Sequence, residues 1–268
     1  MKKPKVSHLK KFISNPLFLR ILPIGLIVAV WLCITESGWI RPLFIPGISH
    51  FIKVYQDMAP YLLASAGMSL LMIFTGFFIG TAWGIISGLL MAYSRVSYYM
   101  FGGILDFIRP VPILALIPLF VIWFGIGVFP QIALIVLGCS IILGVNTTEA
   151  IRNVPRLQIN AALTLGANRK QIYRTMIIPM IAPNIIGAIR LSAATSFGLD
   201  MAAEFIGAQI GLGYMMIVYE KYLRTEGILA VVLIISIIAY ITDIIIAKIE
   251  KKLTRWTERS MKSVGMRI

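Results

Sequence analysis

The chain has few of the groups from which enzyme active sites and metal centres are built. Its 268 residues include two cysteines, Cys33 and Cys139, and two histidines, His8 and His50. Both cysteines fall within long apolar runs and the two histidines are far apart. The spacing therefore excludes a disulfide framework and a zinc, haem or iron–sulfur site, and no metal or cofactor is expected in this chain.

Catalytic motifs are missing as well. The sequence contains no G-x-x-x-x-G-K-[ST] phosphate loop, no nucleophile elbow and no H-E-x-x-H motif. No pair of carboxylates stands in a setting suited to acid–base catalysis. We therefore expect that the chain is not an enzyme and does not hydrolyse ATP itself.

Charge is also scarce. Charged residues make up 13% of the chain and hydrophobic residues 59%, and the mean hydropathy is +0.88, whereas a soluble domain has about 25% charged residues. At about 20 residues per span, the sequence predicts an all-α polytopic membrane protein with one transmembrane domain over 1–268. Six transmembrane helices are expected near 17–36, 62–92, 100–124, 130–148, 180–203 and 228–248.

The net charge of +14 is distributed unevenly along the chain. With these spans, Lys and Arg gather in the arm 1–16, the loop 149–179 and the tail 249–268. The opposite loops hold only four basic residues: Arg41, Lys53, Lys221 and Arg224. The positive-inside rule then places both termini and the loop 149–179 in the cytoplasm. Basic ends beside a membrane meet the anionic headgroups of the lipid bilayer, so no nucleic acid is needed as a partner.

The loop from Glu149 to Pro179 begins with a predicted helix that ends at a glycine. Leu157, Ala161 and Leu165 are four residues apart and share one face of this helix. Gly166 then stands where a helix ends in a left-handed residue, a conformation that glycine tolerates best.

A second short helix is predicted in the same loop. Asn168 is a suitable N-cap, and Gln171 three residues later completes a capping-box pair. Ile172 and Met176 give the helix an apolar edge, and Pro179 is expected to end it. A pair of short helices around a glycine indicates a surface that contacts something.

At these residues the chain resembles a known family. Asn160-Ala161-Ala162, three residues, Gly166, nine residues and Met176-Ile177-Ile178-Pro179 are similar to the E-A-A-x3-G-x9-I-x-L-P signature of the membrane subunits of ABC importers. In that family the segment is the cytoplasmic coupling helix, which docks onto the ATPase subunit. The resemblance thus implies ATPase-coupling roles for Asn160, Ala161, Ala162, Gly166, Ile178 and Pro179. Three positions depart from the signature, and Asn160 in place of Glu removes one charged contact. Without the resemblance, the segment would be an amphipathic interfacial helix pair with no partner.

Two further stretches resemble one branch of that family, the permeases for nitrate, sulfonate, taurine and bicarbonate. Riboflavin and pyrimidine-precursor importers share this branch. One stretch, R-P-V-P-I-L-A-L-I-P-L-F-V-I-W-F-G-I-G, begins at Arg109. By itself its proline spacing predicts only a kinked helix. The other stretch fits G-x-x-R-x-S at Arg190 and A-E…G-L-G-Y at Glu204, whereas Asp200 departs from the branch, where an apolar residue is usual.

Arg190, Asp200 and Glu204 all lie in the least hydrophobic predicted span. A charge at mid-bilayer costs about 2.5–3.5 kcal/mol on insertion scales, so such residues face protein or water. For these three residues, a structural ion pair is favoured over direct contact with a solute in the translocation path. For Arg109, a structural role and contact with the solute are both possible.

Gly76, Gly80, Gly84 and Gly88 place four glycines on one face of the second predicted span. Small residues at this spacing allow two helix backbones to approach closely. Packing against another helix of the same chain is favoured over a contact between two copies.

The resemblance runs from about residue 60 to 248 and implies the type I importer permease fold (MetI-like) in a bacterial cell membrane. It also implies a homodimer, two copies of a cytoplasmic ATPase that would bind the ATP, and an external solute-binding protein. Because Arg109 and Arg190 are at or near membrane depth, and arginine suits sulfonate, nitrate or carboxylate groups, a small organic or inorganic anion is favoured as the solute. An aromatic vitamin precursor, such as riboflavin or a pyrimidine, is the alternative.

Two other classes of membrane protein fit the sequence less well. A secondary transporter would need ion-coupling carboxylates and inverted repeats, but Asp200 and Glu204 lie near one face of a helix and no repeat is apparent. A membrane enzyme would need a reactive cluster, which the sequence does not contain.

Overall fold

The computed structural model describes residues 16–38, 41 and 43–254, and all regular structure in this part of the chain is helical. The prediction of an all-α protein is therefore confirmed. The longer helices are α2 (Pro16–Glu36), α3 (Ile48–Tyr93), α7 (Val128–Arg152), α10 (Ile178–Gly207), α11 (Leu212–Lys221) and α12 (Thr225–Leu253). The shorter ones are α4 (Arg95–Ser97), η1 (Tyr98–Gly102), α5 (Gly103–Ile108), η2 (Ile113–Leu116), α6 (Ile117–Phe124), α8 (Arg156–Thr164), α9 (Arg169–Gln171) and η3 (Ile172–Ile177).

Four helical stretches are long and apolar enough to cross a membrane: His50–Tyr93, Val128–Arg152, Arg169–Gly207 and Thr225–Leu253. A fifth crossing results if the bent pair Arg95–Ile108 and Ile113–Phe124 counts as one span. The described part of α2 contributes a shorter apolar helix, Gly25–Glu36. The six-span count therefore stays a prediction, as does the single domain over 1–268.

Long-range contacts divide the chain into two compact units, which we describe separately: residues 1–59 with 219–230, and residues 60–218 with 231–268. In the first unit, Arg224 donates hydrogen bonds to Glu226 (3.1 Å) and to Asp57 (3.2 Å). These hydrogen bonds raise the pKa of Arg224. Trp31 packs edge-on against Phe51, with ring centroids 5.8 Å apart.

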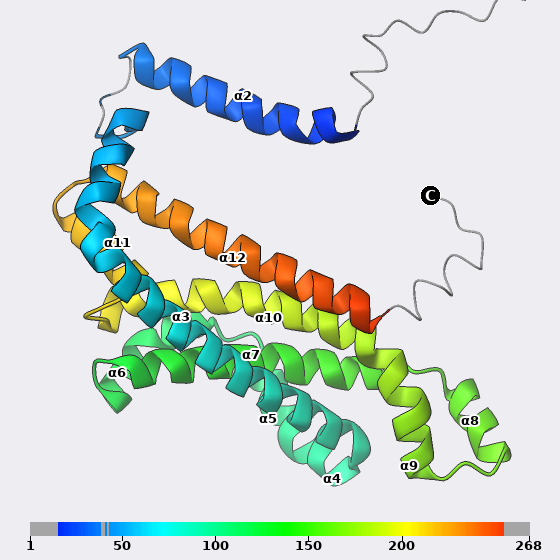
Figure 1. The fold of residues 1–268 in the computed structure, drawn as a ribbon. Helices are drawn as coiled ribbons and strands as arrows, with labels where there is room; N and C mark the ends of the chain where they lie inside the picture. Colours follow the sequence, from blue (N-terminus) through cyan, green and yellow to red (C-terminus); the bar gives the residue numbers. More distant parts are fainter. Residues whose placement is uncertain (1–15, 39–40, 42, 255–268) are drawn as a thin grey trace, which may run out of the picture. The chain divides into compact units, whose positions relative to one another are not determined.

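In the second unit, α10 runs beside α7 along much of its length (Figure 1). The core between these helices is apolar and includes Leu134, Ile135 and Cys139 of α7 and Leu199 of α10. Ile117 of α6 and Phe77 of α3 complete it. Burial of such side chains stabilises a fold through close packing, which in a membrane is the main attraction between helices.

The four glycines of α3 lie against α7. A Cβ atom added at Gly76, Gly80, Gly84 or Gly88 would come within 2.6–2.7 Å of a Cβ atom of α7, so a larger residue would require the helices to separate. The facing residues are also spaced by four: Ile135, Cys139, Leu143 and Thr147. The predicted close packing within one chain therefore matches the geometry between α3 and α7.

Side-chain hydroxyls reinforce this close approach. Ser140 Oγ of α7 lies 3.3 Å from the carbonyl oxygen of Gly80, and Thr148 Oγ1 lies 3.4 Å from that of Gly88. The single proton of each hydroxyl is shared with a nearer carbonyl oxygen of α7 itself, at Val136 and Gly144. Such contacts reach across helices only where the backbones are near one another.

The predicted kinked helix at residues 100–124 is broken rather than kinked. The segments on either side of the break are inclined at 89°. Pro110 and Pro112 lie in the break, where a missing N–H and a fixed φ prevent the helix from continuing. Pro118 stands in the first turn of α6, a place that accepts proline.

The contact between α3 and α7 predicts a difference between two glycines of the same helix. Gly80→Leu should lower the stability of the protein by about 1–3 kcal/mol, as expected for an overpacked contact, because Val136 and Cys139 leave no room for a side chain. Gly67→Leu should have little effect, because nothing lies within 4 Å of a Cβ atom there. Thermal unfolding of both variants in the same detergent tests this, and equal shifts of the midpoint would contradict the packing described.

Candidate functional site

The first helix of the loop 149–179 ends as the sequence predicts. Gly166 adopts a left-handed conformation with φ +82°. Its N–H donates to the carbonyl oxygen of Leu163 (2.9 Å), and the N–H of Ala167 donates to that of Ala162 (3.0 Å). These two hydrogen bonds form a Schellman motif. They fix the direction in which the chain leaves α8.

The capping box at the next helix is also confirmed. Asn168 Oδ1 accepts a hydrogen bond from the N–H of Gln171 (2.9 Å), and Gln171 Oε1 accepts one from the N–H of Asn168 (2.8 Å). The expectation that Pro179 ends this helix is wrong. α9, η3 and α10 form one helical stretch, Arg169–Gly207, and Pro179 lies in the first turn of α10. The preceding π-helical turn changes the hydrogen-bond pattern at this point, and the first turn of a helix tolerates a proline.

One face of α8 is apolar and open to the surroundings. The side chains of Leu157 and Leu165 are 80% and 88% exposed, and Asn160 and Ala161 are exposed as well. Ala162 and Ile159 instead pack on the buried cluster formed by Ile172, Ile177 and their neighbours. The loop is thus anchored on one side and presents leucines on the other, an arrangement suited to docking against another protein.

The intramembrane acidic pair lies near the opposite end of the same helical stretch. Both Asp200 and Glu204 are buried, at 0% and 1% exposure. Glu204 Oε1 accepts a hydrogen bond from Ser69 Oγ of α3 (2.6 Å), and Oε2 accepts from the N–H groups of Gly213 and Tyr214. These N–H groups belong to the first turn of α11, where free donors and the helix dipole favour a negative charge.

The segment after α10 is shaped around this carboxylate. The N–H of Leu212 donates to Ser69 Oγ (2.9 Å), so the first three N–H groups of α11 are all satisfied by Ser69 and Glu204. A Cβ atom at Gly211, which has φ +146°, would overlap the carboxylate of Glu204. The G-L-G-Y segment therefore folds over Glu204, and we call this arrangement the Glu204 latch.

Asp200, one turn before Glu204, has no such partners. Neither of its carboxyl oxygens receives a hydrogen bond from an N–H or O–H group of the described residues. Asp200 is also the residue at which the sequence departs from the permease branch that it resembles, where an apolar residue is usual.

The two membrane-level arginines each pair with carboxylates. Arg190 forms ion pairs with Asp243 (2.9 Å) and Glu250 (3.2 Å) of α12, rather than with Asp200 or Glu204. Arg109, at the end of α5, pairs with Glu149 of α7 (3.1 Å), and both of these side chains are more than half exposed. Neither arginine is therefore an unpaired cation, which removes the electrostatic argument for an anionic solute.

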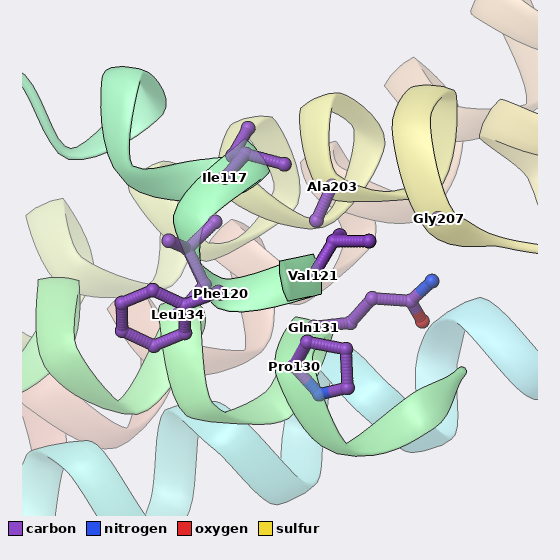
Figure 2. A pocket seen from close by; sticks show the side chains of 8 residues that line it. All are labelled: Ile117, Phe120, Val121, Pro130, Gln131, Leu134, Ala203 and Gly207. Atoms are coloured by element: carbon purple, nitrogen blue, oxygen red, sulfur yellow. The ribbon is translucent and has the colours of Figure 1, made fainter. Parts of the chain in front are cut away.

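A small cavity lies where α6 meets α7 and the end of α10 (Figure 2). Its volume is about 10 Å³, room for no more than one water molecule. Gln131 is the polar side chain among the apolar residues that line it: Ile117, Phe120, Val121, Pro130, Leu134, Ala203 and Gly207. The cavity is too small to hold a transported solute.

Comparison with known proteins shows to which family the chain belongs. The sequence profile of the family "Binding-protein-dependent transport system inner membrane component" matches residues 80–255. The chain belongs to this family. It is thus a multi-pass inner-membrane permease of an ABC importer and not an enzyme, as predicted, and the secondary-transporter and membrane-enzyme alternatives no longer apply.

Relatives match over most of the permease chain. It is 30% identical over 251 residues to the taurine transport system permease protein of Escherichia coli, covering 91% of each chain. It is 28% identical to the putative aliphatic sulfonates transport permease protein of Bacillus subtilis, covering 87% of this chain and 85% of that one. The riboflavin transport system permease protein of Chloroflexus aurantiacus matches a shorter part, with 28% identity and 55% of each chain.

Solved structures show the fold of the permease. The MetNI methionine ABC transporter, in an inward-facing conformation, contains a chain that matches with a TM-score of 0.65 and 22% identity. The match covers 74% of this chain and 98% of that one. An amino acid ABC transporter solved with histidines matches with a TM-score of 0.62 and 20% identity. The predicted MetI-like fold is thereby confirmed.

Several partners of the site residues were missed by sequence reasoning. Ser69, Asp243, Glu250 and Glu149 lie 40 to 135 positions away from the residues they contact. Polar residues in apolar stretches were the available signal, because such residues need partners within the protein. The sequence alone did not identify which residue pairs with Glu204, Arg190 or Arg109.

The Glu204 latch predicts a local effect of one substitution. Glu204→Gln keeps one acceptor oxygen and replaces the other by an NH₂ group, which accepts no hydrogen bond, so the three hydrogen bonds donated by Ser69, Gly213 and Tyr214 cannot all be kept. Leaving buried donors unpaired costs about 1–3 kcal/mol, so the segment 208–221 should exchange its amide hydrogens faster. Glu149→Gln is the matched control, because Glu149 is 55% exposed and its ion pair contributes little. Hydrogen-exchange mass spectrometry of both variants measures the difference, and equal protection of the segment 208–221 would argue against the latch.

Proposed function

We propose that the permease forms a homodimeric path for a small sulfonate-bearing solute. An external binding protein delivers the solute, and two copies of a cytoplasmic ATPase bind and hydrolyse the ATP. The family places this chain in a binding-protein-dependent system. The observation that carries the solute class is the similarity, at 28–30% identity over most of the chain, to permeases named for taurine and for aliphatic sulfonates.

The loop 149–179 is the proposed contact with the ATPase. Asn160, Ala161, Ala162 and Gly166 belong to the exposed helix and its cap, while Ile178 and Pro179 begin α10. Support comes from the apolar face with Leu157 and Leu165, which a partner would bury, and from the two caps, which hold that face in a fixed orientation. Both termini lie on the same cytoplasmic side in the proposed six-span topology.

The helical stretch Arg169–Gly207 is the proposed lever between ATPase and solute path. A helix of 39 residues would measure about 58 Å if straight. It begins at the loop and ends at the Glu204 latch, so a displacement of the loop by the ATPase would reach the latch through one continuous backbone. Arg190 and its carboxylate partners on α12 would move with this lever.

Arg109 and Arg190 do not favour an anionic solute, because carboxylates neutralise both. Asp200 remains open as a path residue or a structural one: no N–H or O–H group of the described residues donates to its carboxyl group, but the residue is fully buried and lies beside Glu204. An aromatic vitamin precursor is the second candidate, favoured by the partial match to the riboflavin permease.

A change at Gly166 tests the coupling role. Gly166→Val should reduce ATP-driven transport strongly while membrane insertion is preserved, because a left-handed conformation costs a β-branched residue about 1–2 kcal/mol or more. Gly166→Asn is the matched control, since asparagine tolerates this conformation and nothing lies within 4 Å of a Cβ atom here. Co-purification of the ATPase and solute uptake are measured for both variants. Wild-type uptake by the valine variant would show that the loop does not couple.

The solute class is tested by reconstitution of the permease with its ATPase and binding protein in liposomes. Solute-stimulated ATP hydrolysis and uptake are measured for taurine, alkanesulfonates, nitrate, riboflavin and a hydroxymethylpyrimidine. We expect stimulation by the sulfonates, and none when the binding protein is left out. Stimulation by the heterocycles alone would overturn the sulfonate class but keep the importer, whereas uptake that does not depend on ATP would contradict the importer itself.

A further inference from the structure

A cavity of about 550 Å³ lies between the loop 149–179 and the helices next to it. Its walls come from the end of α3, the end of α7, and from α8, α9 and η3, all within one compact unit. Figure 1 shows α8 and α9 next to one another at the end of the α7–α10 pair. Family membership assigns no ligand to this cavity.

The rim of the cavity is basic. Arg152, Arg156 and Arg169 line it, and no Asp or Glu is among its described lining residues. None of the three arginines takes part in an ion pair in the part of the chain that the structure describes. Arg152 is instead held by Tyr98: it donates a hydrogen bond to Tyr98 Oη (2.7 Å), and its guanidinium lies 4.9 Å from the centre of that ring. Tyr98 lies outside this cavity, and Arg152 also lines a neighbouring cavity together with Asp106 and Glu149. Arg156 and Arg169 are therefore the two positive charges available here, and they favour an anion in this cavity.

The floor of the cavity is apolar and its wall is aromatic. Ile151, Val154, Ile172 and Ile177 form the floor and are buried in the same cluster. Tyr93 and Tyr173 also line the cavity; they pack edge to face with ring centroids 5.3 Å apart. A free inorganic anion would use only the arginines, whereas a ligand with a charged head and an apolar part would use the whole lining.

The position of the cavity identifies the source of such a ligand. Tyr93 is the last residue of one candidate span, Arg152 is the last of another, and Arg169 is the first of a third. The cavity therefore adjoins the ends of two spans, at Tyr93 and Arg152, where lipid headgroups are expected. Arg169 begins a stretch of 39 residues, longer than the about 20 that a span needs, so the α9 side of the cavity belongs to the loop beyond the span ends. Tyrosine is enriched at the level of the headgroups, and basic pockets between helix ends on the cytoplasmic side suit anionic lipid headgroups.

We propose that this cavity binds the headgroup of an anionic phospholipid. The arginines bind the phosphate, for which their planar, fork-shaped guanidinium groups are suited, and the isoleucine floor contacts the glycerol and the start of the acyl chains. Because the walls come from both the spans and the loop, a bound lipid holds the loop against the helix ends. The proposal concerns a lipid site and does not depend on the identity of the transported solute.

Native mass spectrometry of the full-length permease tests this site, with phosphatidylglycerol and phosphatidylcholine of matched acyl chains as probes. We expect preferential retention of phosphatidylglycerol. A charge near the membrane surface contributes about 1 kcal/mol, so Arg156→Gln combined with Arg169→Gln should weaken retention about 30-fold. Lys170→Gln combined with Arg174→Gln is the matched control: it removes the same charge from the same segment at positions that do not line the cavity. Size-exclusion profiles verify that both double variants remain folded.

Each outcome of this experiment decides the proposal. Retention by the control pair and loss by the cavity pair supports the site. Equal loss in both pairs would mean attraction by overall charge, and equal retention of the two lipids would mean no headgroup selectivity; either result overturns the proposal. Inorganic phosphate and glycerol 3-phosphate are added as competitors. Displacement of phosphatidylglycerol by inorganic phosphate alone would assign the arginines to a free anion and overturn the lipid source.

Discussion

Close approach of α7 to two neighbouring helices is the constraint on which the second unit depends. On one side, the glycines of α3 let its backbone reach the Cβ atoms of α7, and Ser140 Oγ lies 3.3 Å from the carbonyl oxygen of Gly80. On the other side, Leu199 of α10 fills the space above Gly138 of α7. In a bilayer the hydrophobic effect does not drive helices together, so close packing and hydrogen bonds between helices must supply the attraction. The position of α10, and with it that of the loop 149–179 and of Glu204, follows from this packing.

The same helical stretch connects two ends with different requirements. At the loop, the backbone is fixed by local caps that need no partner: the Schellman motif at Gly166 and the box between Asn168 and Gln171. At the other end, Glu204 is fixed by groups from α3 and α11, which hold it only when the helices are assembled. The capped loop end keeps its shape by itself, whereas the Glu204 end depends on the packing of neighbouring helices. This combination would suit a conformational change in which a partner moves the loop and the contacts of Glu204 rearrange.

This contrast also explains what the sequence predicted and what it did not. Gly166, the capping box and the glycine spacing of α3 are local signals, each with a backbone geometry that few other residues satisfy. The partners of Glu204 and Arg190 are contacts over long sequence distances, and a single sequence offers several acceptable donors and acceptors for each. Pro179 misled the prediction because proline ends helices in their interior but is accepted in a first turn. For Arg190 the sequence favoured a structural ion pair, and the structure shows one, with Asp243 and Glu250 of α12 as partners; the sequence indicated the need for a partner but not which residue supplies it.

Because carboxylates of the same chain neutralise Arg109 and Arg190, these arginines are poorly suited to select the solute. Arg190 joins α10 to α12 through two carboxylates, and Arg109 joins α5 to α7, so both serve the packing of this chain. A path that carried a strong fixed charge would hold an oppositely charged solute too tightly to release it. In the proposed importer, Arg109 and Arg190 would not add such a charge, because each is neutralised within this chain. A solute delivered by an external binding protein would then be selected mainly before it reaches the permease. This proposal is compatible with relatives named for different solutes, such as taurine and riboflavin.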